Sequence, residues 1–350
     1  MSASSQASEP TQVVDVETGP DTESGSSALT GRSGSEDRSL RQIAWRRLRR
    51  DKVAMVSGVI VVLLILAAVF APLLVKWFGH SPTQFHQDLI DPVRRVPYMD
   101  PDNPDLGPDP WGGMSSEHLL GVEPTTGRDL FSRILYGAQI SLLVAFLSTL
   151  MCITLGTIFG LVAGYLGGWV DTVISRAMDI FLAFPLMLFA IALVGVIPEG
   201  MFGLEGNGLR IGVIVFIIGF FNWPYIARIV RGQTLTLRER EFVEAARSLG
   251  AGNRHILVKE ILPNLITPII VYSTLLIPTN ILFEAALSFL GVGINPPTPS
   301  WGKMLSEAIP TYGTAPYFVI IPGLAIFVTV LAFNLFGDGL RDAFDPKTSD

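Results

Sequence analysis

Histidine and cysteine, two common metal-binding residues, are few in this chain of 350 residues. The histidines are His80, His86, His118 and His255. Their positions do not follow the short, regular spacings that are typical of metal sites in sequence. We therefore predict that the four histidines are scattered in the fold and that the chain has no metal site.

Catalytic motifs are not found in the sequence either. The one cysteine, Cys152, lies inside an apolar run, so an intrachain disulfide is excluded and a small buried side chain is favoured. The one Gly-Lys pair, Gly302-Lys303, is followed by Met304 and lacks the upstream glycine of a nucleotide-binding loop. We expect no catalytic residue and no cofactor in this chain, so any ATP and magnesium must be bound by partner subunits.

Four polar residues lie in otherwise apolar runs and are candidates for a polar path through a membrane. They are Glu284, Asn222, Asn280 and Asn334. An ionisable group inside a membrane is a functional candidate by default. Glu284 either lines a cavity or is a solvated group near the outer end of its run, and each asparagine either lines the path or bonds a neighbouring helix.

The composition explains why such runs exist. The chain is 49% hydrophobic and only 16% charged, whereas soluble domains are about 25% charged. Six stretches free of charge approach or exceed the ~20 residues that cross a bilayer. The predicted membrane spans are 53–77, 135–165, 173–197, 209–231, 264–290 and 317–341. Prolines inside the runs, such as Pro185 and Pro224, are expected to kink packed helices without ending them.

The second span carries three glycines at intervals of four residues, Gly156, Gly160 and Gly164. At helical spacing they form a groove on one face, where another helix can approach closely. The groove serves either packing within this chain or a partner subunit.

Basic residues set the expected orientation. Residues 1–40 are polar and predict a disordered tail. The basic segment 41–52 either binds nucleic acid or, as we favour, anchors the first span beside a membrane. The loop 232–263 is also rich in arginine, so the positive-inside rule makes both regions cytoplasmic.

With six spans, both termini are then cytoplasmic, including the tail 342–350. The segment 78–133 becomes an extracytoplasmic loop, and 134–341 forms a core of five helices that contains the cytoplasmic loop. We expect a multi-pass protein of a bacterial cell membrane that contacts the bilayer and no nucleic acid.

The cytoplasmic loop has the clearest local pattern. Residues 241–249 predict a helix with Ala245, Ala246 and Leu249 on one face, and Gly250 can end it with a positive φ. Asn253 can cap a second short helix, and Leu262-Pro263 leads into the next span. The loop is either an ordinary charged connection or a helix–turn–helix whose small residues admit another backbone.

The order Glu244-Ala245-Ala246, three residues, Gly250, and then Leu262-Pro263 resembles the coupling loop of binding-protein-dependent ABC importer permeases. In that family the loop inserts into a groove on the ATPase subunit. The resemblance implies an all-α fold of six transmembrane helices, the type I ABC importer permease fold, with a cytoplasmic coupling helix. The residues it assigns to coupling are Glu244, Ala245, Ala246, Arg247, Gly250, Leu262 and Pro263.

Other segments resemble the C-type subunit of the dipeptide and oligopeptide permease branch. They are Gly127-Arg128-Asp129 before the second span, Leu287-Ser288-Phe289-Leu290-Gly291 after the fifth, and Gly337-Asp338-Gly339 near the end. Val122-Glu123 departs from the Thr-Asp that the branch usually has after Leu-Gly. The likeness covers roughly residues 41–346, without the insert 81–114.

The resemblance implies a transport subunit, not an enzyme, in an ATP-driven importer of di- or oligopeptides. The implied partners are a second, B-type permease, two ABC ATPase subunits or domains, and an extracytoplasmic substrate-binding protein. Permeases for nickel, glutathione or another non-peptide solute are the alternative. An ion-coupled secondary transporter is less favoured because no internal repeat is seen, and an intramembrane enzyme because no span contains a histidine.

Overall fold

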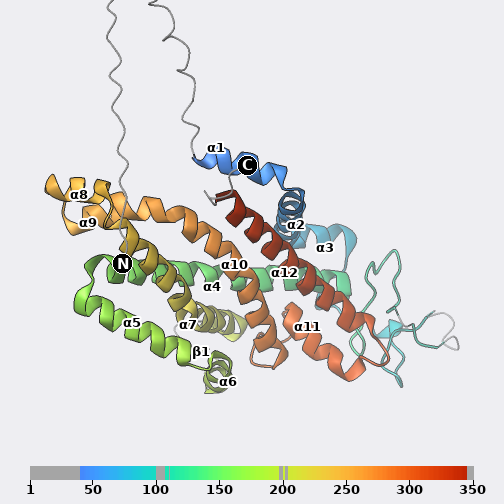
Figure 1. Cartoon of the computed structure of the whole chain (residues 1–350). Helices are drawn as coiled ribbons and strands as arrows, with labels where there is room; N and C mark the ends of the chain where they lie inside the picture. The colour runs from blue at the N-terminus through green and yellow to red at the C-terminus, as the bar shows by residue number, and fades with distance from the viewer. Residues whose placement is uncertain (1–39, 100–106, 110, 197–199, 202–203, 345–350) are drawn as a thin grey trace, which may run out of the picture.

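A computed structural model describes residues 40–99, 107–109, 111–196, 200–201 and 204–344. The predicted tail 1–40, apart from its last residue, and most of the predicted tail 342–350 lie outside the described residues. The regular secondary structure of the described chain is helical, apart from two strands of two residues each (Figure 1). The predicted all-α class therefore agrees with the fold.

Five helices in the described chain are long and apolar enough to cross a membrane. Three of them contain internal prolines, which packed membrane helices tolerate. The five helices are α2 (Lys52–Val69), α4 (Leu130–Leu166), α7 (Gly206–Leu237), α10 (Leu262–Phe289) and α12 (Tyr317–Phe344). Each overlaps one of the predicted spans, although α4 extends five residues before the predicted start at 135.

The third predicted span is a broken helix. The prediction of one continuous helix over 173–197 is wrong, because α5 (Gly168–Ala183) and α6 (Leu186–Val196) meet at a bend of 75°. Pro185 has no backbone N–H, and it forces Phe184 out of the helical region to φ −77° and ψ 128°. Counted as one span, the bent pair brings the possible number of crossings to six.

The first predicted span is interrupted more mildly. Helix α2 ends at Val69, and after Phe70 the helix α3 (Ala71–Phe78) follows with a proline in its first turn. Ahead of them, α1 (Leu40–Arg50) carries the basic residues, and Asp51 caps α2 by accepting from the backbone N–H groups of Val53 and Ala54. The predicted basic segment is thus a helix joined to the first span by one residue.

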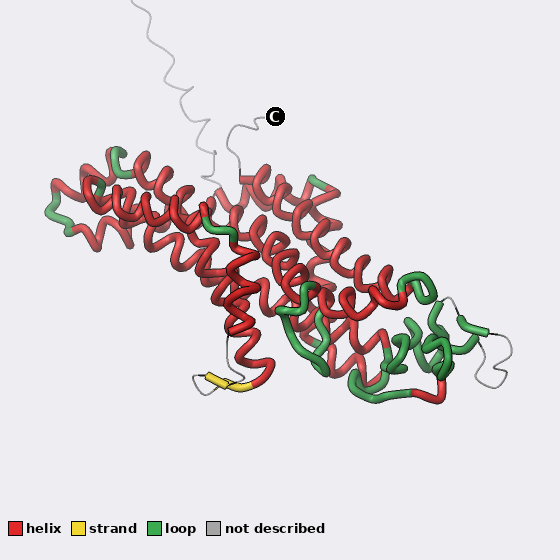
Figure 2. The backbone as a smooth tube through the Cα atoms, turned by 90° about the horizontal axis from the view of Figure 1, so that it is seen from below, coloured by secondary structure: helices red, strands yellow, loops and turns green. Residues whose placement is uncertain are grey.

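Short elements connect the long helices. They are the 3-10 turn η1 (Gln87–Leu89), the antiparallel pair β1 (Gly200–Met201) and β2 (Leu204–Glu205), α8 (Glu241–Ser248), α9 (Asn253–His255), the π-helical turn η3 (Ile256–Ile261), α11 (Trp301–Ala308) and the 3-10 turn η4 (Ile309–Thr311). Figure 2 shows most of the irregular chain between α3 and α4 at one end of the helices. Helix α8 and its turns lie at the other end, as the labels of Figure 1 show.

Helices α4 and α7 share the most extensive contact in the described chain. A Cβ added at Gly156 would lie 2.6 Å from Ile226 Cβ, and one added at Gly160 would lie 2.7 Å from the Ala227 carbonyl oxygen. Gly164 meets Thr234 in the same way, at 2.7 Å. The glycine groove thus receives α7 of the same chain, the first of the two alternatives that the sequence left open.

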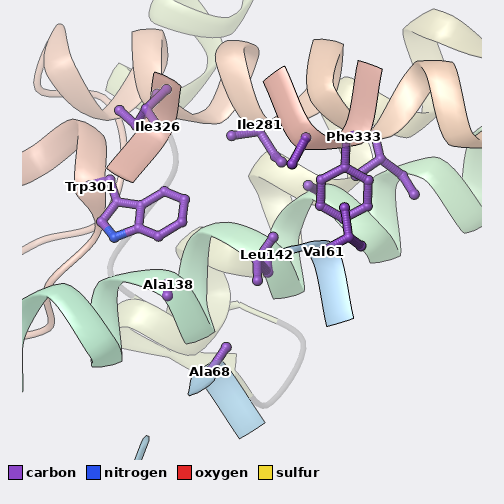
Figure 3. Close-up of a cluster of buried hydrophobic side chains, with 12 residues drawn as sticks. Val61, Ala68, Ala138, Leu142, Ile281, Trp301, Ile326 and Phe333 are labelled. Carbon is purple, nitrogen blue, oxygen red and sulfur yellow. The ribbon is translucent and has the colours of Figure 1, made fainter. Parts of the chain in front are cut away.

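A second packing centre joins four helices. Val61 of α2, Leu142 of α4, Ile281 of α10 and Phe333 of α12 belong to one buried cluster (Figure 3). Trp301, at the start of α11, closes the cluster, and its indole N–H donates to the Ile134 carbonyl oxygen at 3.1 Å. This cluster fixes how the first and last long helices sit against the centre of the bundle.

Candidate functional site

Helix α8 is held against the bundle by one face only. Val243 is fully buried with Ile256 and Ile261 of η3. The opposite face is open, with Ala245 exposed and the Leu249 side chain 89% exposed. Nothing in the described chain covers this face of α8, so it is open to contact with another molecule.

The turn after α8 has a defined geometry. Gly250 has φ +83°, in the left-handed region, as the sequence predicts. The Gly250 N–H donates to the Arg247 carbonyl oxygen and the Ala251 N–H to the Ala246 carbonyl oxygen, both at 3.0 Å. This pair of bonds is the Schellman arrangement, which satisfies the last carbonyls of a helix. A Cβ added at Gly250 meets nothing within 4 Å, so the requirement for glycine within this chain is conformational.

The other residues of the predicted coupling loop divide between the two faces. Glu244, Arg247 and Pro263 are exposed. Ala246 and Leu262 are half-buried against the cluster that holds Val243, so the prediction that Ala245 and Ala246 share one face with Leu249 is wrong for Ala246. A helix of 3.6 residues per turn places Ala246 above Val243.

The predicted cap at Asn253 is also wrong. Gly252 precedes α9, and no side chain caps it. Asn253 Oδ1 instead accepts a hydrogen bond from the Tyr165 hydroxyl, at 3.2 Å. The second turn of the loop is therefore tied to the end of α4, so α8 is connected to the same helix that packs on α7.

Ion pairs connect the broken span to α7. Arg231 Nη2 donates to Asp171 Oδ2 at 2.6 Å, and Arg228 Nη2 donates to Asp179 Oδ1 at 2.6 Å. Arg238 reaches the other way and donates to the Gly164 carbonyl oxygen at 3.1 Å. The end of the bundle beside α8 is thus crosslinked by charged side chains.

Glu284 lies inside the bundle. It is fully buried, so the alternative of a solvated group at the membrane surface is wrong. The hydroxyls of Ser141 and Ser288 donate to its two carboxyl oxygens, each at 2.7 Å. The carboxyl group therefore joins α4 to α10, and a role for it in a translocation path stays a prediction.

The three candidate asparagines do not line a common cavity among the described residues. Asn280 is fully buried and donates to Thr149 Oγ1 at 2.8 Å, whereas Asn334 is half-buried. Asn222 is 6% exposed, and its Nδ2 has no hydrogen-bond partner among the described residues. A cleft between α7 and α10 is lined by side chains such as Gln233 and Tyr272 and by none of the four candidates. Their place in a path stays a prediction.

The far end of the bundle contains a buried network of charges. Glu123 pairs with Arg133 and with Arg128, whose Nε lies 2.6 Å from Glu123 Oε2. Glu307 of α11 accepts from Arg133 at 3.0 Å. Glu123 and Arg133 are each 1% exposed. Glu123, where the sequence departs from the usual pattern of the peptide permease branch, is therefore part of the buried core at this end.

Three of the four histidines are brought together at the same end, which the sequence did not predict. His80, His86 and His118 can each offer a ring nitrogen, and these nitrogens lie within 4.8 Å of one another. His255 lies apart, in α9. Burial, followed by the neighbouring His118 and His80, lowers the pKa of His86 below its ordinary value. The expectation of scattered histidines is therefore wrong, because a segment without secondary-structure period folds back on itself.

Comparisons with known proteins identify the family. One family model, described as the binding-protein-dependent transport system inner membrane component, matches residues 156–350, which is more than half of the chain. This chain belongs to that family. A second model, the N-terminal TM domain of oligopeptide transport permease C, matches residues 39–97 of this permease.

Individual relatives agree with the family. The glutathione transport system permease proteins GsiD of Escherichia coli O157:H7 and of Shigella sonnei are each 44% identical to this permease over 303 residues, covering 87% of this chain and 89% of theirs. A solved structure, the MetNI methionine ABC transporter in an inward-facing conformation, has a TM-score of 0.47 and 19% identity and covers 60% of this chain and 96% of its own. The predicted recognition as a C-type permease of the peptide branch is confirmed, and the chain is a multi-pass permease subunit of an ABC importer.

Proposed function

We propose that this permease is the C-type subunit of an ATP-driven importer of glutathione or a closely related short peptide. The observation that supports it is the 44% identity to glutathione permeases over 87% of this chain. The sequence alone favours di- and oligopeptides and leaves glutathione among the alternatives. Glutathione is itself a tripeptide with one unusual linkage, so the two substrates share most of their chemistry.

Linear di- or oligopeptides are the second candidate. The match of residues 39–97 to the oligopeptide permease model favours them. That region contains α2 and α3, which lie at the start of the chain and pack on α4 and α12. We expect the separate binding protein to decide mainly whether glutathione or a linear peptide is transported.

The proposed mechanism uses α8 as the contact with an ATPase subunit. Its exposed face carries Ala245, Leu249 and the charged Glu244 and Arg247. Closure of two ATPase subunits around ATP would push on this face, and the Asn253–Tyr165 bond connects the loop to α4. From α4 the movement would pass to α7 through the glycine groove and would open or close a path shared with a second permease.

The proposed topology follows from the same arrangement. We propose that α8 and both chain ends lie in the cytoplasm and that residues 78–133 face the binding protein outside. Figure 1 places α8 and the segment before α4 at opposite ends of the bundle, which this topology requires. The broken pair α5 and α6 then counts as the third crossing.

The substrate is tested by deleting the gene and measuring uptake of labelled glutathione, a labelled linear tripeptide and nickel ions in parallel. We expect glutathione uptake to be lost and to return when the wild-type gene is supplied. Loss of tripeptide uptake alone would favour the second candidate, and loss of nickel uptake alone would refute the peptide class. Unchanged uptake of all three compounds would refute the proposed substrates.

A further inference from the structure

Three imidazole rings meet in the segment that precedes α4. The ring centroids of His80 and His118 are 4.6 Å apart, those of His86 and His118 are 5.0 Å apart, and those of His80 and His86 are 5.1 Å apart. His118 is 5% exposed, and the other two rings are half-buried. The rings come from positions separated by up to 38 residues, because His80 follows α3, His86 precedes η1 and His118 lies close to the start of α4.

The nitrogens of the rings are left with capacity for a further partner. His80 Nδ1 and His86 Nε2 are buried and have no hydrogen-bond partner among the described residues. A buried polar atom without a partner is costly and calls for an explanation such as an ion. Two such rings packed against a third histidine at one point are difficult to explain by ring packing alone.

His118 has the partner that metal-bound histidines typically have. Its Nδ1 lies 2.9 Å from Asp129 Oδ1, in a buried contact. A histidine ligand usually donates one ring N–H to a carboxylate, which orients the ring and directs the other nitrogen to the metal. In this arrangement His118 Nε2 is the nitrogen left for an ion.

The backbone around the rings is closely packed. Asp129 is the N-cap of α4 and accepts from the Ser132 N–H at 2.9 Å and from the Ser132 hydroxyl at 2.6 Å. A Cβ at Gly127, which has φ +68°, would collide with the His86 carbonyl oxygen. The residues that support the rings are thus fixed by contacts of their own, as a binding site needs.

We propose that His80, His86 and His118 bind one divalent transition-metal ion, with zinc the best fit, and that Asp129 orients His118 for this role. Imidazole suits zinc, copper, nickel and iron, whereas calcium and magnesium prefer oxygen ligands. Zinc–nitrogen bonds of about 2.0–2.1 Å in a tetrahedron require nitrogens roughly 3.3 Å apart. The nitrogens lie within 4.8 Å of one another, so the rings must move together by up to about 1.5 Å when the ion binds.

The bound ion would connect three parts of the chain. It would tie His80, which follows α3, and His86, which precedes η1, to His118 in the chain before α4. His118 is separated from the other two histidines by more than 30 positions in the sequence. A three-histidine site leaves a fourth position for water or for a group from outside the chain. The ion would thereby fix these three parts of the chain relative to one another.

The test uses the assembled importer purified in lipid nanodiscs, stripped with a chelator and titrated with zinc chloride. Binding is measured by calorimetry and by metal content for the wild type, His80→Asn and His86→Asn, both of which change half-buried rings. His255→Asn is the matched control, because this exposed histidine lies in α9, away from the cluster. Asp129→Asn tests the orienting role.

We expect the wild type and His255→Asn to bind one zinc ion per copy of this chain. His80→Asn and His86→Asn should each bind at least about 100-fold more weakly, and Asp129→Asn about 10–100-fold more weakly. Zinc should raise the thermal unfolding midpoint of the wild type and not that of His86→Asn. Equal zinc binding by the wild type and His86→Asn, or no binding by the wild type, would overturn the proposal and leave the rings as packing contacts.

Discussion

The buried charge network before α4 and the outer face of α8 treat charged side chains in opposite ways. At the end before α4, Glu123 and Arg133 are each 1% exposed and pair with one another. At the end that carries α8, Glu244 and Arg247 are exposed, and Leu249 is 89% exposed. The network before α4 therefore satisfies its charges internally, whereas the outer face of α8 presents both charges and an apolar side chain outward.

The difference separates stability from assembly. A buried ion pair that loses one partner leaves a charge without compensation, which is costly. An exposed side chain that loses its contacts costs little in an isolated chain. Substitutions before α4 should therefore change the free energy of unfolding, and substitutions on the outer face of α8 should change transport and leave stability almost unaltered.

The largest effect is expected from Glu123→Ala. This change leaves Arg133 buried with Glu307 as its remaining acidic partner, so the free energy of unfolding should fall by about 3–5 kcal/mol. Chemical denaturation of the purified subunit in detergent measures it. Glu244→Ala is the matched control on α8 and should change that free energy by no more than about 0.5 kcal/mol. Equal effects of the two substitutions would contradict the difference between the ends.

A smaller effect is expected between the ends, where α4 meets α7. Gly160→Ala adds a Cβ 2.8 Å from Val230 Cβ and 2.7 Å from a backbone oxygen, so the free energy of unfolding should fall by about 1–3 kcal/mol. Gly232→Ala, in the same helix pair, meets nothing within 4 Å. It should be neutral or stabilise by up to about 1 kcal/mol. Denaturation of both variants tests whether close packing, rather than loss of a glycine, sets the effect.

The sequence predicts the helices better than the contacts between distant segments. Apolar runs identify every long helix, and the positive φ of Gly250 follows from its place after a short helix. The break at Pro185 was missed because a proline in an apolar run is compatible with a kink as well as with a break. Run length alone does not distinguish these outcomes.

Sites built from separate segments were not predictable in the same way. Glu284 is enclosed by Ser141, more than a hundred positions away, as well as by Ser288 one turn along its own helix. The three histidines meet through a segment that has no helical or strand period. Nothing in their spacing encodes the fold of that segment, so the cluster of rings is seen only in the three-dimensional structure.

The smallest expected effect on stability belongs to Leu249→Asp. The side chain is exposed, so the free energy of unfolding should change by no more than about 0.5 kcal/mol. Uptake should nevertheless fall at least tenfold, because an apolar anchor of the proposed ATPase contact becomes a charge. Leu249→Met keeps the apolar character and should keep most of the uptake. Normal uptake by Leu249→Asp would remove Leu249 from the proposed contact.

The most direct test of the account is a crosslink from α8 to the ATPase subunit. Cys152 is first replaced by alanine, and a single cysteine is then introduced by Ala245→Cys on the exposed face of α8 or by Val93→Cys, at an 88% exposed residue of the opposite end. Membranes containing the whole importer are treated with a short thiol crosslinker, and intact cells with an impermeant thiol reagent. The account predicts that Ala245→Cys joins the permease to the ATPase and is protected from the impermeant reagent, whereas Val93→Cys is labelled from outside and forms no such crosslink. Labelling of Ala245→Cys from outside, or a crosslink to the ATPase from Val93→Cys alone, would contradict the proposed role of α8.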